Sequence, residues 1–334
     1  MPIATRLHRF GPPADSISIA EIEDRMPSDG EVAVAMLAAP INPADINVIE
    51  GKYGDLPELP ATIGNEGVGR IAALGPHVDG LHVGQLVLPM AFGTWTQRMI
   101  VPADTVVPLP DSLDVRQAAM LTVNPATAWR LLHDFVTLQP GEWIVQNAAN
   151  SGVGRSVIQL ARALGFKTLN VVRRTELIDD LLAAGADRVV LEDTDLRATV
   201  DSLCDGCRPR LALNSVGGPS ALNIANALAR NGCHVTFGAM SRLPLKIPNG
   251  LVIFSNLTFR GFWLKRWRET ASPDVLRSTY ATLATHLEKR TLHTPVDAVF
   301  PLGQLPSALD AASREKRAGK ILLDLTSPPE TVTP

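Results

Sequence analysis

The 334-residue sequence contains few cysteines, few aromatic residues and no long hydrophobic run. Its three cysteines, Cys204, Cys207 and Cys233, cannot form a disulfide framework and are typical of a reducing compartment. No apolar stretch approaches the roughly 20 residues that a membrane-spanning helix requires. We therefore predict a protein that neither spans a membrane nor depends on disulfides for its fold.

An excess of positive charge is also absent. The 31 Lys and Arg residues and 34 Asp and Glu residues give a formal net charge of −3, so nucleic acid and anionic membranes are not expected partners. The first residues, Met1 to Arg6, resemble a strand, so we expect no leader within this sequence. The expected location is the cytoplasm, or the mitochondrial matrix if a leader has been removed.

Length and patterning predict two domains. Short strand patterns at residues 31–36, 67–75 and 85–89, broken by Gly and Pro, indicate a small β-rich domain. Residues 42–54, which include Tyr53, are interpreted as a loop of that domain.

From about residue 140, apolar strands alternate with amphipathic helices, which indicates an α/β protein with a doubly wound parallel sheet. The strand candidates are residues 143–147, 168–172, 188–191, 210–216, 234–237 and 257–262. A later strand at residues 320–325 is expected to return to the first domain. We predict a six-stranded Rossmann domain at residues 121–265 and a β-rich domain formed by residues 1–120 and 266–334.

A segment of small residues joins the first strand of the expected sheet to its helix. At Asn150, Ser151, Gly152 and Val153, backbone N–H groups at a helix N-terminus can approach a pyrophosphate closely. The usual first glycine of a G-x-G-x-x-G motif is absent, so an ordinary helix-capping turn is the alternative. The strand before and the helix after favour a dinucleotide site.

Two arginines at the end of the second strand predict the cofactor. Arg173 lies 21 positions after Gly152 (173 − 152 = 21), where NAD-preferring sites place an acidic residue. A guanidinium holds a ribose 2′-phosphate, whereas a carboxylate repels it. Arg173 and Arg174 therefore predict NADPH, and two solvated arginines are the alternative.

Several motifs together resemble the mitochondrial-type trans-2-enoyl thioester reductases of the medium-chain dehydrogenase/reductase superfamily. They are residues 42–53, 56–60, 64–68, 123–128, 147–154, 211–218 and 260–264. The likeness spans most of the chain, and the segment with Tyr53 is its most specific part. It implies a GroES-like catalytic domain beside the Rossmann domain.

The resemblance also implies the site residues. Tyr53 matches the family's active-site tyrosine, and a phenol with a reference pKa near 10 can donate a proton to a developing enolate. The implied cofactor contacts are Asn124, Asn150, Ser151, Gly152, Val153, Arg173, Arg174, Phe237, Gly238, Ala239, Met240, Phe262, Trp263, Leu264 and Lys320. The chain departs from the family at Thr175, where an arginine is usual, and at Ala239, where a glycine is more usual.

The same resemblance bears on metal binding. Asn65 stands where the zinc-bearing branch of the superfamily has a histidine, and Asp45 lies near the first expected thiolate. Zinc prefers Cys and His ligands, and Cys204-x-x-Cys207 is only half of a zinc ribbon. We therefore expect no metal.

The implied reaction is zinc-free, NADPH-dependent reduction of an enoyl thioester of coenzyme A or acyl carrier protein, with Tyr53 as donor. One alternative is a quinone or general enone reductase of the same superfamily, and another is a non-enzymatic NADPH-binding protein. A homodimer is expected, because residues 257–262 are a candidate edge strand that a second copy would protect.

Overall fold

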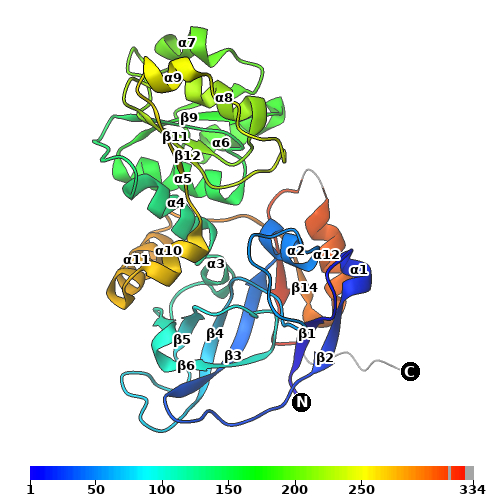
Figure 1. Ribbon diagram of the computed structural model, residues 1–334. Helices are drawn as coiled ribbons and strands as arrows, with labels where there is room; N and C mark the ends of the chain where they lie inside the picture. Colours follow the sequence, from blue (N-terminus) through cyan, green and yellow to red (C-terminus); the bar gives the residue numbers. More distant parts are fainter. Residues whose placement is uncertain (315–316, 328–334) are drawn as a thin grey trace. The chain divides into compact units, whose positions relative to one another are not determined.

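The computed structural model describes residues 1–314 and 317–327, and the chain divides into two compact units (Figure 1). The first, here called the β-rich unit, comprises Met1–Val123 and Arg277–Pro334. The second, the parallel-sheet unit, comprises Asn124–Leu276. The sequence-based boundaries were residues 120/121 and 265/266, so the last five of the seven residues of α10 (Leu264–Thr270) lie beyond the second boundary but inside the parallel-sheet unit.

The β-rich unit is built on a seven-stranded sheet. Its strands are β14 (Val296–Pro301), β15 (Lys320–Asp324), β3 (Glu31–Pro40), β4 (Val68–Leu74), β5 (Leu86–Pro89) and β7 (Val106–Pro108) in that order, with β6 (Arg98–Pro102) also paired to β3. A separate antiparallel pair is formed by β1 (Ile3–Leu7) and β2 (Ile17–Glu21). Because β15 pairs with β3, the prediction that the last strand returns to the first domain is confirmed.

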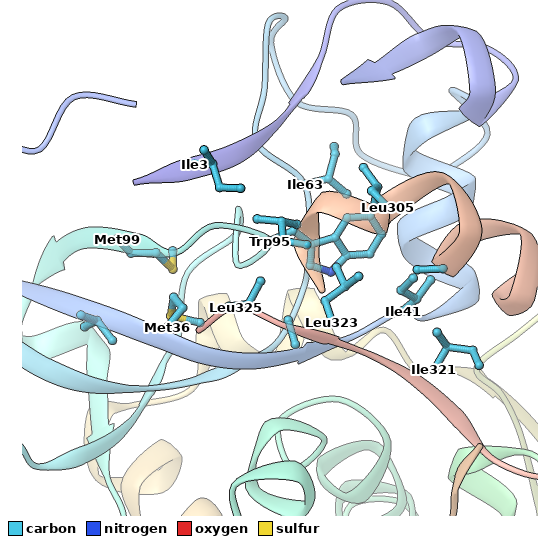
Figure 2. Packing of buried hydrophobic residues seen from close by; sticks show 14 of the residues in the cluster. Ile3, Met36, Ile41, Ile63, Trp95, Met99, Leu305, Ile321, Leu323 and Leu325 are labelled. Carbon is cyan, nitrogen blue, oxygen red and sulfur yellow. The ribbon is translucent and has the colours of Figure 1, made fainter. Parts of the chain in front are cut away.

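Trp95 lies at the centre of the main hydrophobic core of this unit. Its side chain is fully buried, and the indole Nε1 donates a hydrogen bond to the Pro40 carbonyl at 3.2 Å. Figure 2 shows Ile63, Leu305 and Leu323 around the indole. The ring thus joins β15 and the C-terminal helix to the N-terminal part of the unit, which fixes the two chain segments of the unit to each other.

Four helices of 4 to 9 residues and most of the 16-residue α11 accompany these strands. They are α1 (Pro13–Ser16), α2 (Pro43–Ile49), α3 (Val115–Ala119), α11 (Pro273–Glu288) and α12 (Leu305–Ser313), with 3₁₀ turns η1 (Ala103–Thr105) and η3 (Leu302–Gln304). The interpretation of residues 42–54 as a loop was wrong for α2. Pro43 supplies a fixed φ at the first helical position, and the backbone N–H of Asn42 donates to the Asp45 carboxylate at 2.7 Å, which starts the helix.

The parallel-sheet unit confirms the predicted doubly wound fold. Its six strands, all parallel, are in the order β10 (Arg188–Leu191), β9 (Lys167–Val172), β8 (Trp143–Gln146), β11 (Leu211–Asn214), β12 (Cys233–Thr236) and β13 (Thr258–Gly261). Its other elements are α4 (Asn124–His133), α5 (Gly152–Leu164), η2 (Thr175–Leu177), α6 (Ile178–Ala183), α7 (Leu196–Leu203), α8 (Gly218–Asn226) and α9 (Asn249–Ile253), together with α10. The strand order reverses between β8 and β11, and ligands of such sheets bind at the carboxyl edge beside that point.

No helix in the described part of the chain is both long enough and apolar enough to cross a bilayer. Cys204 and Cys233 are buried and Cys207 is exposed, and all three are free thiols.

Candidate active site

The loop between β8 and α5 permits a close approach of backbone to a ligand. Ser151 caps α5 by accepting a hydrogen bond from the N–H of Gly154 at 3.1 Å. A Cβ at Gly152 would lie 2.8 Å from the amide nitrogen of Asn124, and a Cβ at Gly154 would lie 2.5 Å from the Ala149 carbonyl oxygen. Larger residues at Gly152 and Gly154 would therefore displace their neighbours and block the helix N-terminus, where an anion binds.

Asn124 supplies a buried polar group beside this loop. The residue is 8% exposed, and its Nδ2 has no hydrogen-bond partner among the described residues. An unsatisfied buried donor costs about 1–3 kcal/mol, so such a group indicates a position where a ligand acceptor is expected. The structure thus brings Asn124 and Gly152 together, and the arrangement fits an anionic dinucleotide.

A network of buried amides holds the carboxyl edge of the sheet between β8 and β12. Nδ2 of Asn147 donates to Oδ1 of Asn214 at 2.8 Å, and Oδ1 of Asn147 accepts from the N–H of Ser215 at the same distance. Nδ2 of Asn214 donates to Oγ1 of Thr236 at 3.0 Å. These hydrogen bonds therefore join three strand ends. The sequence reasoning assigned no role to the two asparagines. Their position at the end of an apolar strand is the sequence signal that could have identified them.

The two predicted phosphate-binding arginines follow β9, which is the neighbour of β8. Arg173 is exposed, and Nη1 of Arg174 lies 3.6 Å from Oε1 of Glu176. Surface ion pairs of this kind contribute only about 0–1 kcal/mol, so Glu176 does not prevent Arg174 from binding an anion.

The two segments predicted to contact the nicotinamide follow neighbouring strands. Residues 237–240 leave β12 and residues 262–264 leave β13, and Thr236 is in register with Gly261. Phe262 packs edge-on against Phe135, with ring centroids 6.0 Å apart. Met240 is 62% exposed and Trp263 is 38% exposed, whereas Leu264 is buried. The predicted cofactor residues of this unit therefore all lie on the loops and helix starts at one edge of the sheet.

Tyr53 and Lys320 belong to the β-rich unit. Tyr53 follows α2, whose end is fixed by a hydrogen bond from the Lys52 N–H to the Asn47 carbonyl at 2.8 Å. The Tyr53 ring is partly buried and packs against the main core of the unit. The ammonium of Lys52 pairs with Glu50 at 2.8 Å. The backbone that leads to Tyr53 is thus held by a hydrogen bond, and the Tyr53 ring is held by its packing against the core.

Two buried carboxylates lie at the N-terminus of α2. Asp45 accepts hydrogen bonds from the N–H of Asn42 at 2.7 Å, the N–H of Asn65 at 3.0 Å and Nδ2 of Asn65 at 2.7 Å. Glu66 accepts from Nδ2 of Asn42 at 2.8 Å, the N–H of Val123 at 2.8 Å and the hydroxyl of Thr122 at 3.3 Å. Each carboxylate is therefore satisfied by donors from its own unit.

Lys320 joins this group through Asn42. Its ammonium donates a hydrogen bond to Oδ1 of Asn42. Burial lowers the pKa of Lys320, while the charges of Glu66 and Asp45 raise it. Burial is also the largest cause that raises the pKa of Asp45 to about 6, and the hydrogen bonds from Asn42 and Asn65 oppose it. We call Asn42, Asp45, Asn65, Glu66 and Lys320 the buried polar network. From the sequence, only three of them were singled out: Asp45 and Asn65 as unsuitable metal ligands, and Lys320 as a cofactor contact.

The donor set of this network does not fit zinc. No cysteine lies in the β-rich unit, and Asn65 supplies an amide rather than an imidazole. The oxygens of Asp45 and Glu66 are engaged by N–H and O–H donors. Among residues 1–314 and 317–327, no group of three or more His, Cys, Asp or Glu residues is placed to hold a metal ion.

Comparisons with known families match both units. Residues 28–111 match the family model described as the alcohol dehydrogenase GroES-like domain, and residues 152–280 match the zinc-binding dehydrogenase model. With the fold, these matches define the class as the medium-chain dehydrogenases and reductases.

Comparison with individual proteins identifies the family within this class. Human mitochondrial enoyl-acyl-carrier-protein reductase is 41% identical over 322 residues, which cover 94% of this chain and 86% of that protein. Among solved structures, the mitochondrial 2-enoyl thioester reductase Etr1p/Etr2p heterodimer from Candida tropicalis is 29% identical, with a TM-score of 0.87 over 97% of this chain and 99% of that one. A structure of Etr1p with NADP and crotonyl-CoA gives the same values.

A third similar structure is a Bacillus thuringiensis protein assigned as an NADPH:quinone reductase. It is 31% identical, with a TM-score of 0.90 over 97% of this chain and 98% of that one. Since the curated relative exceeds 40% identity over nearly the whole chain, the chain belongs to the mitochondrial-type enoyl-acyl-carrier-protein reductase family. The resemblance inferred from the motifs is confirmed.

Proposed function

We propose that the protein reduces trans-2-enoyl thioesters to saturated acyl thioesters with NADPH. The observation that carries the proposal is the relationship to enoyl reductases over 94% of the chain. The unsatisfied Asn124 amide beside the β8–α5 loop, and the exposed arginine after β9, support the cofactor assignment. Neither feature requires a metal.

The cofactor is assigned to the parallel-sheet unit. Residues 150–153 bind the pyrophosphate through backbone N–H groups, and Arg173 and Arg174 bind the 2′-phosphate. Residues 237–240 and 262–264, at the other half of the sheet edge, contact the nicotinamide half. Asn124 donates its free N–H to the cofactor, and Lys320 is proposed as a further cofactor contact because it matches the family's cofactor-contacting lysine.

The role of proton donor to the substrate is assigned to Tyr53. When bound, NADPH supplies the hydride that reaches the β-carbon of the enoyl group. Negative charge then builds on the thioester oxygen, and the Tyr53 phenol donates a hydrogen bond or proton to that oxygen or to the α-carbon. The buried polar network fixes the start of α2, and α2 leads directly to the Tyr53 loop, so the network keeps the donor in a defined position.

Oxidation of NADPH by crotonyl-CoA tests this function. We expect rapid, substrate-dependent loss of NADPH absorbance, formation of butyryl-CoA, and much slower turnover with NADH. Absence of butyryl-CoA, or equal efficiency with NADH and NADPH, would contradict the assignment.

A quinone reductase is the second candidate, because the Bacillus thuringiensis structure resembles this fold at a TM-score of 0.90. Such an activity needs neither a thioester nor a tyrosine donor. A higher kcat/KM with a soluble quinone than with crotonyl-CoA, unchanged in Tyr53→Phe, would favour this candidate.

We also propose a homodimer. Strand β13 is an edge of the parallel sheet and is mostly exposed, so its free backbone groups can pair with a second copy. Light scattering after size-exclusion chromatography is expected to give twice the chain mass of 35.8 kDa. The location, cytoplasm or mitochondrial matrix, stays a prediction, although the relatives carry the word mitochondrial in their names.

A further inference from the structure

Two neighbouring side chains at the carboxyl end of β8 are buried amides. Gln146, the last residue of β8, is 1% exposed, and Asn147, which follows it, is 2% exposed. Successive side chains along an extended strand point to opposite faces of the sheet. β8 lies between β9 and β11, at the point where the strand order reverses. The two amides are therefore placed to contact different halves of the carboxyl edge.

Gln146 contacts the half that is proposed to bind the phosphates. Its Nε2 donates hydrogen bonds to the carbonyl of Gly154 at 3.0 Å and to Oδ1 of Asn170 at 2.7 Å. Gly154 lies in the first turn of α5, and Asn170 lies in β9, which ends directly before Arg173. A single amide thus joins the helix N-terminus of the proposed pyrophosphate site to the strand that leads to the arginines.

Asn147 contacts the half that is proposed to bind the nicotinamide. Its Nδ2 donates to Oδ1 of Asn214 at 2.8 Å and to Oγ of Ser220 at 3.1 Å. Its Oδ1 accepts from the N–H of Ser215 at 2.8 Å. Asn214 ends β11, and Ser220 lies in α8. Asn147 therefore fixes both ends of the connection between β11 and α8.

The end of β11 in turn supports the segment that leaves β12. The N–H of Phe237 donates to the carbonyl of Asn214 at 2.9 Å, and the N–H of Met240 donates to the carbonyl of Ser215 at 3.0 Å. Phe237 and Met240 are among the predicted nicotinamide contacts. A shift of the residues that Asn147 holds would therefore move the support of the nicotinamide ring rather than that of the phosphates.

We propose that Gln146 and Asn147 are positioning residues that act on different ends of NADPH. Gln146 holds the phosphate-binding groups together, and Asn147 holds the nicotinamide where its hydride reaches the enoyl β-carbon. This inference rests on the proposed function. Loss of one hydrogen bond changes binding by about 3–10-fold, whereas misplacement of reacting atoms by about 1 Å lowers a rate by about 10²-fold. The two residues therefore control different measurable quantities.

Gln146→Met and Asn147→Leu test this division in the full chain, because each replaces an amide with an apolar group of similar shape. The ligand for the binding measurement is adenosine 2′,5′-bisphosphate, which has the 2′-phosphate of the cofactor but no nicotinamide. We expect Gln146→Met to weaken its binding about 3–10-fold and to change kcat with saturating NADPH by less than about twofold. We expect Asn147→Leu to lower kcat for crotonyl-CoA about tenfold or more and to leave the binding within about twofold. Calorimetry and steady-state kinetics measure the two quantities.

A milder matched pair keeps the test independent of folding defects. Thr236→Val and Thr168→Val each remove a hydroxyl that accepts from an asparagine Nδ2, that of Asn214 at 3.0 Å and that of Asn170 at 2.9 Å respectively. Thr236 ends β12, directly before the predicted nicotinamide contacts, whereas Thr168 lies at the amino end of β9. We expect Thr236→Val to lower kcat about three- to tenfold without weakening the bisphosphate, and Thr168→Val, the control, to change neither quantity by more than about twofold.

Parallel changes would overturn the proposal. If both amide variants altered kcat and bisphosphate binding by the same factors, or altered neither, the two amides would only stabilise the sheet. If an amide variant failed to fold, Thr236→Val would decide, and an unchanged kcat or an equal loss in Thr168→Val would count against the proposal. Failure of the proposed function is distinct, because the wild type would then bind the bisphosphate but reduce no enoyl thioester.

Discussion

The β8–α5 loop and the buried polar network differ in whether their polar groups have hydrogen-bond partners within the protein. At the loop, the Asn124 amide has a donor without a partner in the described structure, and Arg173 is exposed. In the network, the carboxylates of Asp45 and Glu66 each accept three hydrogen bonds within the β-rich unit. The difference suggests a rule: unsatisfied groups indicate where a ligand binds, and satisfied groups indicate where the protein holds its own parts in place.

Removing the proposed donor is the largest expected change. Tyr53→Phe keeps the ring that packs on the core but deletes the hydroxyl. We expect kcat for crotonyl-CoA to fall about 10²–10³-fold, with the dissociation constant of NADPH nearly unchanged. Steady-state kinetics and NADPH fluorescence titration measure the two quantities, and unaltered turnover would remove Tyr53 from the mechanism.

Removing one carboxylate from the buried polar network is expected to affect the stability of the protein more than the binding of its ligands. Asp45→Ala leaves three N–H donors without their acceptor, one buried donor of Asn42 and two half-buried donors of Asn65, so the free energy of unfolding is expected to fall by about 3 kcal/mol. Asp104→Ala, at an exposed position, is the control and should change it by less than about 0.5 kcal/mol. Urea denaturation checks both, and equal values for the two variants would contradict the comparison.

The cofactor arginines test the ligand-binding side of the same comparison. Arg173→Ala with Arg174→Ala removes charge-assisted contacts of about 1.5–3 kcal/mol in total, so the preference for NADPH over NADH should fall roughly 10–100-fold. The loss is expected in KM for NADPH, while kcat with saturating NADPH changes little. A preserved NADPH/NADH ratio would show that other groups bind the 2′-phosphate.

His234 is an exception to the rule that unsatisfied polar groups indicate ligand sites, because no ligand is proposed beside its ring. It is fully buried in β12 beside Phe259, and neither ring nitrogen has a hydrogen-bond partner among the described residues. Burial is the largest cause that lowers the pKa of His234 from 6.5 to about 4, and the nearby backbone groups of Ala221 and of His234 itself oppose it. The unfolded chain therefore binds a proton at pH values where the native protein does not.

The stability of the native state should consequently decrease as the pH falls from about 6.5 towards 4, and the His234 contribution is fully restored above pH 6.5. At pH 5 the loss amounts to about 2 kcal/mol. Thermal or urea unfolding of His234→Leu should lack this part of the pH dependence. Parallel stability profiles of wild type and variant between pH 7 and pH 5 would contradict the assignment.

The parts that the sequence predicts well depend on local rules. Helix α5 begins at Gly152, where the small-residue segment after the first strand predicts a helix start, and the six strands of the parallel sheet follow from apolar runs between helices. The Asn42–Pro43–Asp45 pattern also contains a helix start, but the surrounding Gly and Pro residues favoured a loop interpretation, and α2 was missed.

The buried polar network was not predictable as a unit. Asn42 contacts Lys320 across 278 positions, and Glu66 contacts Val123 across 57. The Asn42–Lys320 contact forms only when sheet pairing brings β15 beside β3, and no local pattern carries that information. The roles of residues 150–153, Arg173 and Arg174 follow from local chemistry and spacing, whereas the roles of the other site residues came from the family resemblance. All of them stay predictions until variants are measured.

The fate of the transferred hydrogen tests the central claim most directly. The protein is incubated with crotonyl-CoA and NADPH that carries deuterium at the transferred position of C4, and the product is examined by NMR and mass spectrometry. The account predicts butyryl-CoA with one deuterium on the β-carbon and a solvent-derived proton on the α-carbon. Deuterium at the α-carbon, or consumption of NADPH without deuterated butyryl-CoA, would contradict it.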